Sequence, residues 1–399
     1  MNSLKRYSSL EFSILLCFIL PPIGIILVLA SGLNTLWIFI KEKKPLLRSL
    51  NSWFFSMLLI ASLGAALSMR EWAFVGSSLL VLGYWGVYLR VVDGSFQPFT
   101  EKFRNLVVFG GVYNCFIGLA FKGESFPLLV SLFIGNIHIA NMDETRLVGA
   151  AYNPNFAVYL LLMAVAFQLA QIFHTVQYRK FSSLWWQLLL LFFLSYGVLE
   201  TGSRAGFFTL IILYMILAFR FGRIAIVAGI STAILVCQGA LRYLPRFSRM
   251  DDSMDGRQAI WRKSIEIWEQ HPLFGVTPVG FGQEYVNAFY EWKPHAHNIF
   301  IGMFAEFGML GGVAFLIMVI HHSFKWSRLF AYEVRDKQES ALYMLVLPII
   351  LLTGLVDQPL FSPQLGVITV VLLGCWDRYS SGLQLEWYKR VVSVSSSVK

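Results

Sequence analysis

Apolar runs of about 17 to 23 residues recur along this chain, and each is long enough to cross a bilayer as an α-helix. Charged residues make up only 14% of the 399 residues, whereas a soluble domain carries about a quarter. The sequence therefore predicts an all-α fold, a polytopic integral membrane bundle with about 10–12 transmembrane segments. These segments form one membrane domain over residues 1–399. The predicted spans are 52–69, 73–91, 105–122, 153–172, 182–200, 204–220, 222–242, 298–320, 339–357 and 360–376.

The N-terminal apolar run over residues 11–40 does not fit a single upright span. It has about 30 residues, too many for one upright crossing and too few for two, and Pro21-Pro22 interrupts it. We predict a re-entrant or short helical hairpin, with a single tilted span as the alternative. Lys5 and Arg6 precede an apolar run, as in a signal peptide, but no small-residue cleavage site follows, so we expect the segment to be retained.

The basic residues are distributed unevenly between the predicted loops. When the 243–297 loop is placed outside, the loops and tail on the inner side carry 19 of the 32 Lys and Arg residues. This is the positive-inside bias of membrane proteins. The net charge of +9 therefore reflects topology and contact with the lipid bilayer, not nucleic-acid binding. We predict an external 243–297 loop and cytoplasmic termini.

Most of the basic residues left on the outer side gather around that one long external loop. This group has eight members, and one of them, Arg204, lies outside the loop in "ETGSRAGFF", where one predicted span ends and the next begins. An outward loop with so many cations is expected to bind an anion. The other seven are Arg242, Arg246, Arg249, Arg257, Arg262, Lys263 and Lys293.

Within the external loop, "RQAIWRKSIEIWEQHP" has apolar residues at helical spacing. We predict an amphipathic helix over 256–270 with Asp255 as N-cap and its tryptophans at headgroup depth. This helix is either a plain interfacial anchor or a binding element in which Arg257, near the N-terminus, faces an anion. Arg262 points to another face. The Gly- and Pro-rich segment "HPLFGVTPVGFGQEY" predicts an irregular, ordered loop beside a ligand.

Cysteine chemistry and a metal centre are not indicated. Cys17, Cys115, Cys237 and Cys375 all lie inside predicted spans, so the outer face has no disulfide framework and no pair with metal-ligand spacing. The external loop contains a few aspartates, but no convincing carboxylate pair was recognised elsewhere on the outer face. We therefore expect no metal and no cofactor.

Four segments in the middle of the chain, over about 150–312, carry a family resemblance. They are "NPNFAVYLL", "TGSRAGFF", "GRQAIWRKSIEIWEQHPLFGV" and "HAHNIFIGMFAEFGMLGG". In this order they resemble the O-antigen ligase and O-antigen polymerase superfamily of bacterial polytopic membrane glycosyltransferases. One departure is "GVTPVGFG", where the family often has Gly-Val-Gly after HPLFG.

The resemblance implies transfer of a glycan from undecaprenyl diphosphate to an acceptor hydroxyl on the outer face of the bacterial cytoplasmic (inner) membrane. The acceptor would be a glycan or a lipid-linked molecule of the cell envelope, as in lipopolysaccharide or other polysaccharide biosynthesis. Arginines neutralise phosphate oxygens through bidentate contacts, so we predict that Arg204 and Arg257 bind the donor diphosphate without a metal.

By the same resemblance His297 is the catalytic residue. It occupies the His-Asn position of "KPHAHNIF" and would act as general base on the acceptor hydroxyl. The alternative is a solvated histidine at a helix start, and His295 is a neighbour with a smaller claim to the same role. Asn298 follows His297 in the motif, and Glu306 lies further along the same span and could orient the base or an arginine. Asn153 and Asn155 either bind sugar or cap a helix.

Two other functions remain open at this point. A repeat-unit polymerase for O-antigen, capsule or exopolysaccharide would use the same donor and differ only in its acceptor. A secondary transporter is a more distant alternative, because the chain shows neither inverted repeats nor several polar residues at mid-membrane.

Overall fold

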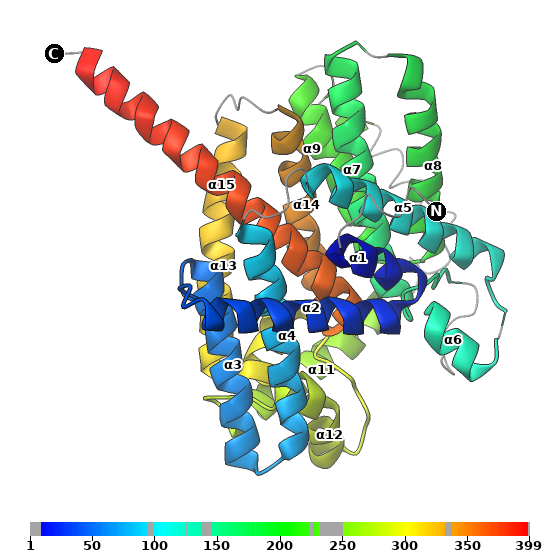
Figure 1. Cartoon of the computed structure of the whole chain (residues 1–399). Helices are drawn as coiled ribbons and strands as arrows, with labels where there is room; N and C mark the ends of the chain where they lie inside the picture. The colour runs from blue at the N-terminus through cyan, green and yellow to red at the C-terminus, as the bar shows by residue number, and fades with distance from the viewer. Residues whose placement is uncertain are drawn as a thin grey trace.

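The computed structural model describes residues 9–93, 99–124, 126–136, 146–179, 181–222, 225, 227, 229–231, 250–331 and 337–397. These parts of the chain are helical and contain no strand, which confirms the predicted all-α membrane bundle (Figure 1). Eight described helices are long and apolar enough to cross a membrane: α2 (Pro21–Lys41), α3 (Leu50–Met69), α4 (Val75–Val92), α5 (Phe99–Ala120), α7 (Pro154–Gln177), α8 (Leu184–Glu200), α9 (Arg204–Phe221) and α13 (Ile299–Ala331).

Three further helices correspond to the start of the N-terminal run and to the last two predicted spans. α1 (Ser9–Ile19) and α14 (Lys337–Gly354) are shorter apolar helices, and α15 (Pro363–Ser397) continues well past the predicted span 360–376. The predicted span 222–242 lies largely outside the described residues, and so does Cys237.

The N-terminal run forms two helices, as the hairpin predicts. α1 ends at Ile19, and α2 begins at Pro21 and Pro22, which have the fixed φ and the missing N–H that the first turn of a helix tolerates. The two helices pack together, and the backbone of Cys17 leaves no room for a side chain at Gly24. Figure 1 shows α2 lying across α4.

α7 is the central helix of the bundle. Side chains along its whole length are buried, and it packs on α5, α8, α9 and α14. A second group, α2, α3, α4, α13 and α15, packs beside it. The site described below lies where α7 and α13 begin and α14 ends.

Side-chain caps define where the important helices begin. The Oδ1 of Asn153 accepts the N–H of Asn155 at the start of α7, and the Oγ of Ser203 accepts the N–H of Gly206 at the start of α9. The Oδ1 of Asn298 accepts the N–H groups of Phe300 and Ile301 at 2.9 and 3.1 Å, which caps α13. Because such caps satisfy otherwise free backbone donors, they fix where each helix starts.

The segment after the predicted loop helix contains more structure than expected. α11 (Met250–Gln270) starts earlier than residue 256, so Asp255 lies inside the helix and is not its N-cap. A second helix, α12 (Thr277–Phe289), replaces most of the predicted irregular loop. Pro278 in its first turn explains how "GVTPVGFG" starts a helix. Only the residues between the two helices are irregular.

These irregular residues pair with a break in α13. Gly308 has φ 61° and ψ −161°, which interrupts the helix and frees backbone groups. The N–H of Met309 donates to the carbonyl of Pro272 at 2.8 Å, and the N–H of Val276 donates to the carbonyl of Ala305 at 3.0 Å. Gly275, at φ 67°, lies against the backbone of the same break. At Gly308 the chain therefore pairs with the HPLFG segment instead of continuing a regular helix.

The break makes a prediction about stability. Gly308→Ala should cost about 1–3 kcal/mol, because only glycine adopts this φ/ψ region without strain. A methyl group there would also meet the backbone of Leu273. We expect the thermal midpoint of the detergent-purified protein to fall by several degrees. Gly382→Ala is the control, because nothing lies near a methyl group at that exposed position. Equal midpoints for the two variants would contradict the role of the break.

Basic side chains gather at the end of the bundle away from α11 and α12. There, Lys44 and Arg48 each lie 3.4 Å from the carboxylate of Asp93, and Lys325 lies 3.6 Å from Asp377. The turn between α3 and α4 lies at the opposite end, where Phe74 leaves no space for a side chain at Gly280 of α12. A 20-residue helix spans about 30 Å, so α3 separates the two ends by roughly the thickness of a membrane core.

Candidate active site

His297 forms a hydrogen-bonded pair with a residue that the sequence analysis overlooked. Its Nδ1 lies 3.1 Å from the Oδ1 of Asp357, which stands between the end of α14 and the short helix η5 (Pro359–Phe361). The side chain of Asp357 is 10% exposed, whereas that of His297 is 24% exposed. The pair therefore has a buried acid and a partly accessible imidazole, an arrangement that orients a base.

Asp357 stays ionised in its buried position. Burial alone would raise its pKa, but the hydrogen bond from His297 and the imidazole of His295 hold the pKa well below its usual range. The N–H of Gln358 also donates to Oδ1, at 2.8 Å. A charged carboxylate accepts from Nδ1–H of His297, and in the neutral imidazole this leaves Nε2 as the acceptor.

His295 is buried, and its surroundings do not suit a base. It is 3% exposed, its ring lies 4.9 Å from that of Phe361, and burial lowers its pKa to about 3. Its Nδ1 accepts the backbone N–H of His297 at 3.3 Å. His297 has a positive φ of 52°, and this bond holds the turn that presents its side chain. His295 thus positions His297.

The two histidines and Asp357 could also hold a cation. One ligand atom from each lies within 4.8 Å of the others. However, Nδ1 of His295 and Oδ1 of Asp357 already accept hydrogen bonds from the N–H groups of His297 and Gln358. A metal bound between the atoms that face one another, Nδ1 of both histidines and Oδ1 of Asp357, would compete with these bonds. The contacts therefore favour the His297–Asp357 pair as an orienting pair over a metal centre.

Arg257 and His297 face the same cleft, which has a volume of about 380 Å³. The Trp261 indole N–H donates to the carbonyl of His297 at 3.1 Å, so α11 is attached directly to the turn that carries His297. The cleft is lined by Gly256, Arg257, Ala259, Ile260, Lys263, Tyr285, Glu291, Lys293 and His297. The structure therefore brings together the predicted base and one predicted diphosphate-binding arginine.

The other tryptophan of α11 and its buried residues pack against neighbouring parts of the protein. The Trp268 indole N–H donates to the carbonyl of Pro272, and its ring lies 5.0 Å from that of Phe304. Ser264 and Ile267 are buried on the same side. The tryptophans expected at headgroup depth thus hold α11 on α12 and α13. Arg262 is exposed and is not among the residues that line the cleft.

The start of α7 contacts both the His295 ring, through Phe156, and the turn before α9, through Arg146. Nη2 of Arg146 donates to the Oδ1 of Asn155 at 2.9 Å, and its Nε donates to the carbonyl of Thr201 at 2.7 Å. Phe156, the next residue, has its ring 6.3 Å from that of His295. Arg146 therefore connects the start of α7 with the turn before α9.

Arg204 is the first residue of α9 and is partly buried. Thr201, three residues earlier, accepts a hydrogen bond from Arg146, which also contacts Asn155 in the first turn of α7. Arg204 therefore lies near the start of α7. Among the described residues, however, it does not line the cleft that holds Arg257. Asn153 caps α7 through its side chain, which favours the capping role over sugar binding for this residue.

Asn298 and Glu306, the two residues predicted to support the site from the span after His297, make main-chain and amide contacts. Nδ2 of Asn298 donates to the carbonyl of Leu355 at 2.9 Å, which ties the start of α13 to the segment before Asp357. Glu306 is buried and accepts a hydrogen bond from the Gln358 side chain at 2.7 Å. The Gln358 Oε1 in turn accepts the N–H of Ala296. Glu306 therefore supports the loop that carries the pair.

Asp357 was missed although the sequence contains a signal for it. In "LTGLVDQPLF" it is a carboxylate at the end of a predicted span, and the alternation of spans places that end on the outer side. An ionisable residue at such a place is expensive and often functional. Its partnership with His297, 60 residues earlier, is a tertiary contact.

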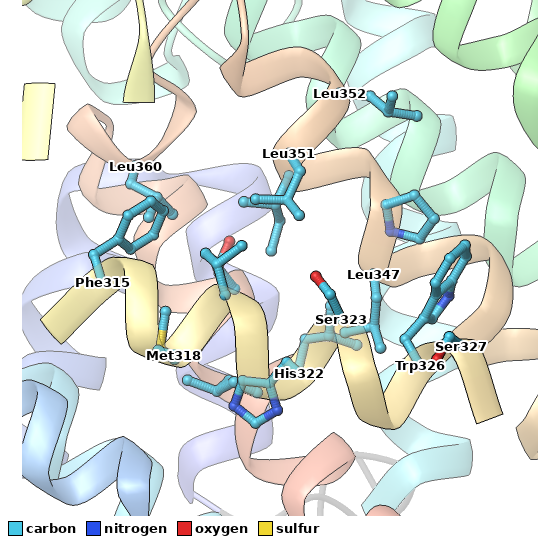
Figure 2. Close-up of a pocket in the computed structure, with 16 residues that line it drawn as sticks. Phe315, Met318, His322, Ser323, Trp326, Ser327, Leu347, Leu351, Leu352 and Leu360 are labelled. Atoms are coloured by element: carbon cyan, nitrogen blue, oxygen red, sulfur yellow. The ribbon is translucent and has the colours of Figure 1, made fainter. Parts of the chain in front are cut away.

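A second cavity offers no comparable chemistry. It measures about 360 Å³ and lies between α13, α14 and α15 (Figure 2). Its polar lining includes His322, whose Nε2 lies 2.7 Å from the Oδ1 of Asn51 and whose Nδ1 accepts the Trp376 N–H. The rest is mostly apolar, with Phe315, Leu347 and Leu351 among the side chains that Figure 2 labels. Such a lining suits a hydrocarbon chain and not a sugar or a phosphate.

A known family model matches the part of the chain that contains most of these site residues. The family model described as O-Antigen ligase matches residues 189–316, which extend from within α8 through α12 into α13. Arg204, Arg257 and His297 lie inside the match, whereas Arg146 and Asp357 lie outside it. None of the curated proteins compared with the chain matches it.

Proposed function

We propose that this chain is a membrane glycosyltransferase of the O-antigen ligase superfamily, and that it transfers a glycan from undecaprenyl diphosphate to an acceptor hydroxyl. The O-antigen ligase family match over residues 189–316 supports this proposal. The reaction takes place on the outer face of the cytoplasmic membrane. The observation that carries the proposal is the cleft that Arg257 and His297 both line, with His297 bound to the buried Asp357.

The pair supplies the base. Asp357 holds the Nδ1–H of His297, so Nε2 can take the proton of the acceptor hydroxyl as its oxygen attacks the anomeric carbon of the donor. The bond between that carbon and the diphosphate oxygen breaks, and undecaprenyl diphosphate leaves with the electron pair. The proton on Nε2 is afterwards released to water.

Arg257 supports the departure of the leaving group. Its guanidinium can contact two phosphate oxygens at once, which neutralises charge that develops as the bond breaks. We assign Arg204 to the same leaving group from the start of α9, close to the contacts of Arg146 with Asn155 and Thr201. No metal is required in this scheme.

A strain that lacks the gene tests the function through its lipid-linked glycans. Long glycans left on the lipid diphosphate, with none attached to the acceptor, are expected for a ligase. Accumulation of single repeat units would assign a polymerase of the same superfamily. Unchanged envelope glycans and unchanged lipid-linked donors would overturn the proposal, and donors confined to the inner leaflet would point to a transporter.

Arg257→Ala should reduce transfer at limiting donor by about ten- to a hundredfold, the cost of one charge-assisted contact of about 1.5–3 kcal/mol. Arg257→Lys should restore part of the loss, because lysine keeps the charge but not the fork. The measurement is the initial rate at low donor concentration with purified protein. Arg262→Ala is the matched control, since that side chain is exposed on the same helix and does not line the cleft. Equal rates for both alanine variants would remove Arg257 from the donor site.

The orientation of the protein in the membrane can be tested separately. With the native cysteines replaced, a cysteine at exposed Gln270 of α11 should react with a membrane-impermeant maleimide in spheroplasts. A cysteine at exposed Gly382 of α15 should react only after the membrane is permeabilised. This follows from the basic residues that gather at the end of the bundle away from α11. The reverse pattern would place the cleft on the cytoplasmic side, where the proposed acceptor is absent.

A further inference from the structure

An internal carboxylate occupies the cationic side of the cleft. Glu291 lies between two lysines, with its Oε1 2.6 Å from the Nζ of Lys293 and its Oε2 3.2 Å from the Nζ of Lys263. Both lysines line the cleft together with Arg257. Two cations therefore share one carboxylate at a place where a substrate anion could contact both.

The cleft also contains a buried hydroxyl group with no partner. Tyr285 is 0% exposed, and its OH has no hydrogen-bond partner among the parts of the chain that the structure describes. A buried hydroxyl without a hydrogen bond is costly, so such a group at the wall of a cleft indicates a ligand that completes it. Lys263 lies over the Tyr285 ring at 5.5 Å, so the hydroxyl and the lysine belong to one surface.

The carboxylate is held in a way that permits exchange. The Glu291 side chain is 45% exposed, and those of Lys263 and Lys293 are 32% and 30% exposed. Ion pairs this accessible to water contribute little to stability, because solvent screens them. A diphosphate carries more charge than one carboxylate and offers more acceptor oxygens, so it can replace Glu291 on both lysines.

We propose that Glu291 is a built-in competitor that occupies an oxyanion site formed by Lys263, Lys293 and the Tyr285 hydroxyl, and that a phosphate-bearing substrate displaces it. This rests on the assignment of the cleft to the transfer reaction. When the substrate anion enters, Glu291 swings toward solvent, and the Tyr285 O–H donates to a phosphate oxygen. Burial raises the pKa of Tyr285 to about 12, so the hydroxyl keeps the proton that it donates at neutral pH.

Binding of inorganic diphosphate to the purified full-length protein tests this exchange without the reaction. Glu291→Gln should tighten binding severalfold, because the competing charge is removed while the side-chain shape is kept. Glu269→Gln is the control, since it changes the net charge equally at an exposed position of α11 outside the cleft. The double variant Lys263→Gln/Lys293→Gln should bind at least tenfold more weakly, and adding Glu291→Gln to it should give no further gain.

Tyr285→Phe separates ligand binding from a structural role. It should weaken diphosphate binding severalfold, whereas the thermal midpoint without ligand should stay equal or rise, because the lost hydroxyl had no described partner. A variant that binds as well as the parent would exclude Tyr285 from the site. Glu291→Gln protein that is folded but binds diphosphate no better than the Glu269→Gln control would overturn the exchange.

Transferase kinetics then identify the substrate that carries the anion. A lower KM for the lipid-diphosphate donor in Glu291→Gln assigns the site to the donor, whereas a lower KM for the acceptor alone assigns it to an acidic group on the acceptor glycan. Both results support the exchange. If no transfer occurs with any lipid-diphosphate donor while the binding shifts hold, the proposed function fails and the anion site stands. If transfer is observed and the binding shifts are absent, the exchange fails and the function stands.

Discussion

His297→Ala should leave a folded, membrane-inserted protein that has lost about a hundred- to ten-thousandfold of its transfer rate, the usual contribution of a general base. The reason is that Nε2 of His297 is the basic atom presented toward the cleft, since Nδ1 is bound to Asp357. The measurement is the single-turnover rate of purified protein with a lipid-diphosphate donor and an acceptor in detergent.

His295→Asn is the comparison variant for this experiment. An asparagine can still accept the N–H of residue 297 through its side chain, so we expect a much smaller loss of rate. Chelation by EDTA should leave the parent rate unchanged. Strong inhibition that magnesium or zinc restores would assign the His295, His297 and Asp357 cluster to a metal. An active His297→Ala enzyme would take the base away from this residue.

Asp357→Asn should lower the transfer rate about as much as His297→Ala does, by about a hundred- to ten-thousandfold, with little loss of donor affinity. An asparagine of the same shape no longer holds the Nδ1–H of His297 with a charge, so the imidazole loses its fixed orientation and tautomer. Because the pKa of Asp357 is held well below its usual range, the carboxylate is charged throughout the neutral and mildly acidic range. An acid limb of the rate near neutrality therefore cannot come from protonation of Asp357.

The control for Asp357→Asn is Asp93→Asn, the same chemical change in an exposed ion-pair cluster at the other end of the bundle. It should leave the rate and KM unchanged. Rate constants from single turnovers and donor titrations separate the two effects of the Asp357 change. A variant that transfers normally would show that His297 needs no acidic partner and would reduce the pair to a structural contact.

The amino-acid sequence by itself determined the class of the fold and part of the site. Apolar runs of spanning length can only satisfy their backbone as helices, so the all-α membrane bundle followed from local composition. "KPHAHNIF" and "RQAIWRKSIEIW" lie within 50 residues of each other. The residue types of the second indicated an anion-binding cation on the external segment, whereas the prediction of His297 as a base came from the family resemblance. Short-range patterns carry that information because they depend on neighbours along the chain.

Only the tertiary structure decided which side chains meet. Asp357 reaches His297 across 60 residues, Gln358 reaches Glu306 across 52, and the HPLFG carbonyls pair with the break at Gly308. No periodicity encodes these contacts, since each depends on how α13, α14 and the loop helices pack. The boundary of α11 was likewise misplaced because its caps and neighbours outside the segment decide where a helix begins. Local chemistry thus fixed the elements of this protein, and packing between distant segments assembled its site.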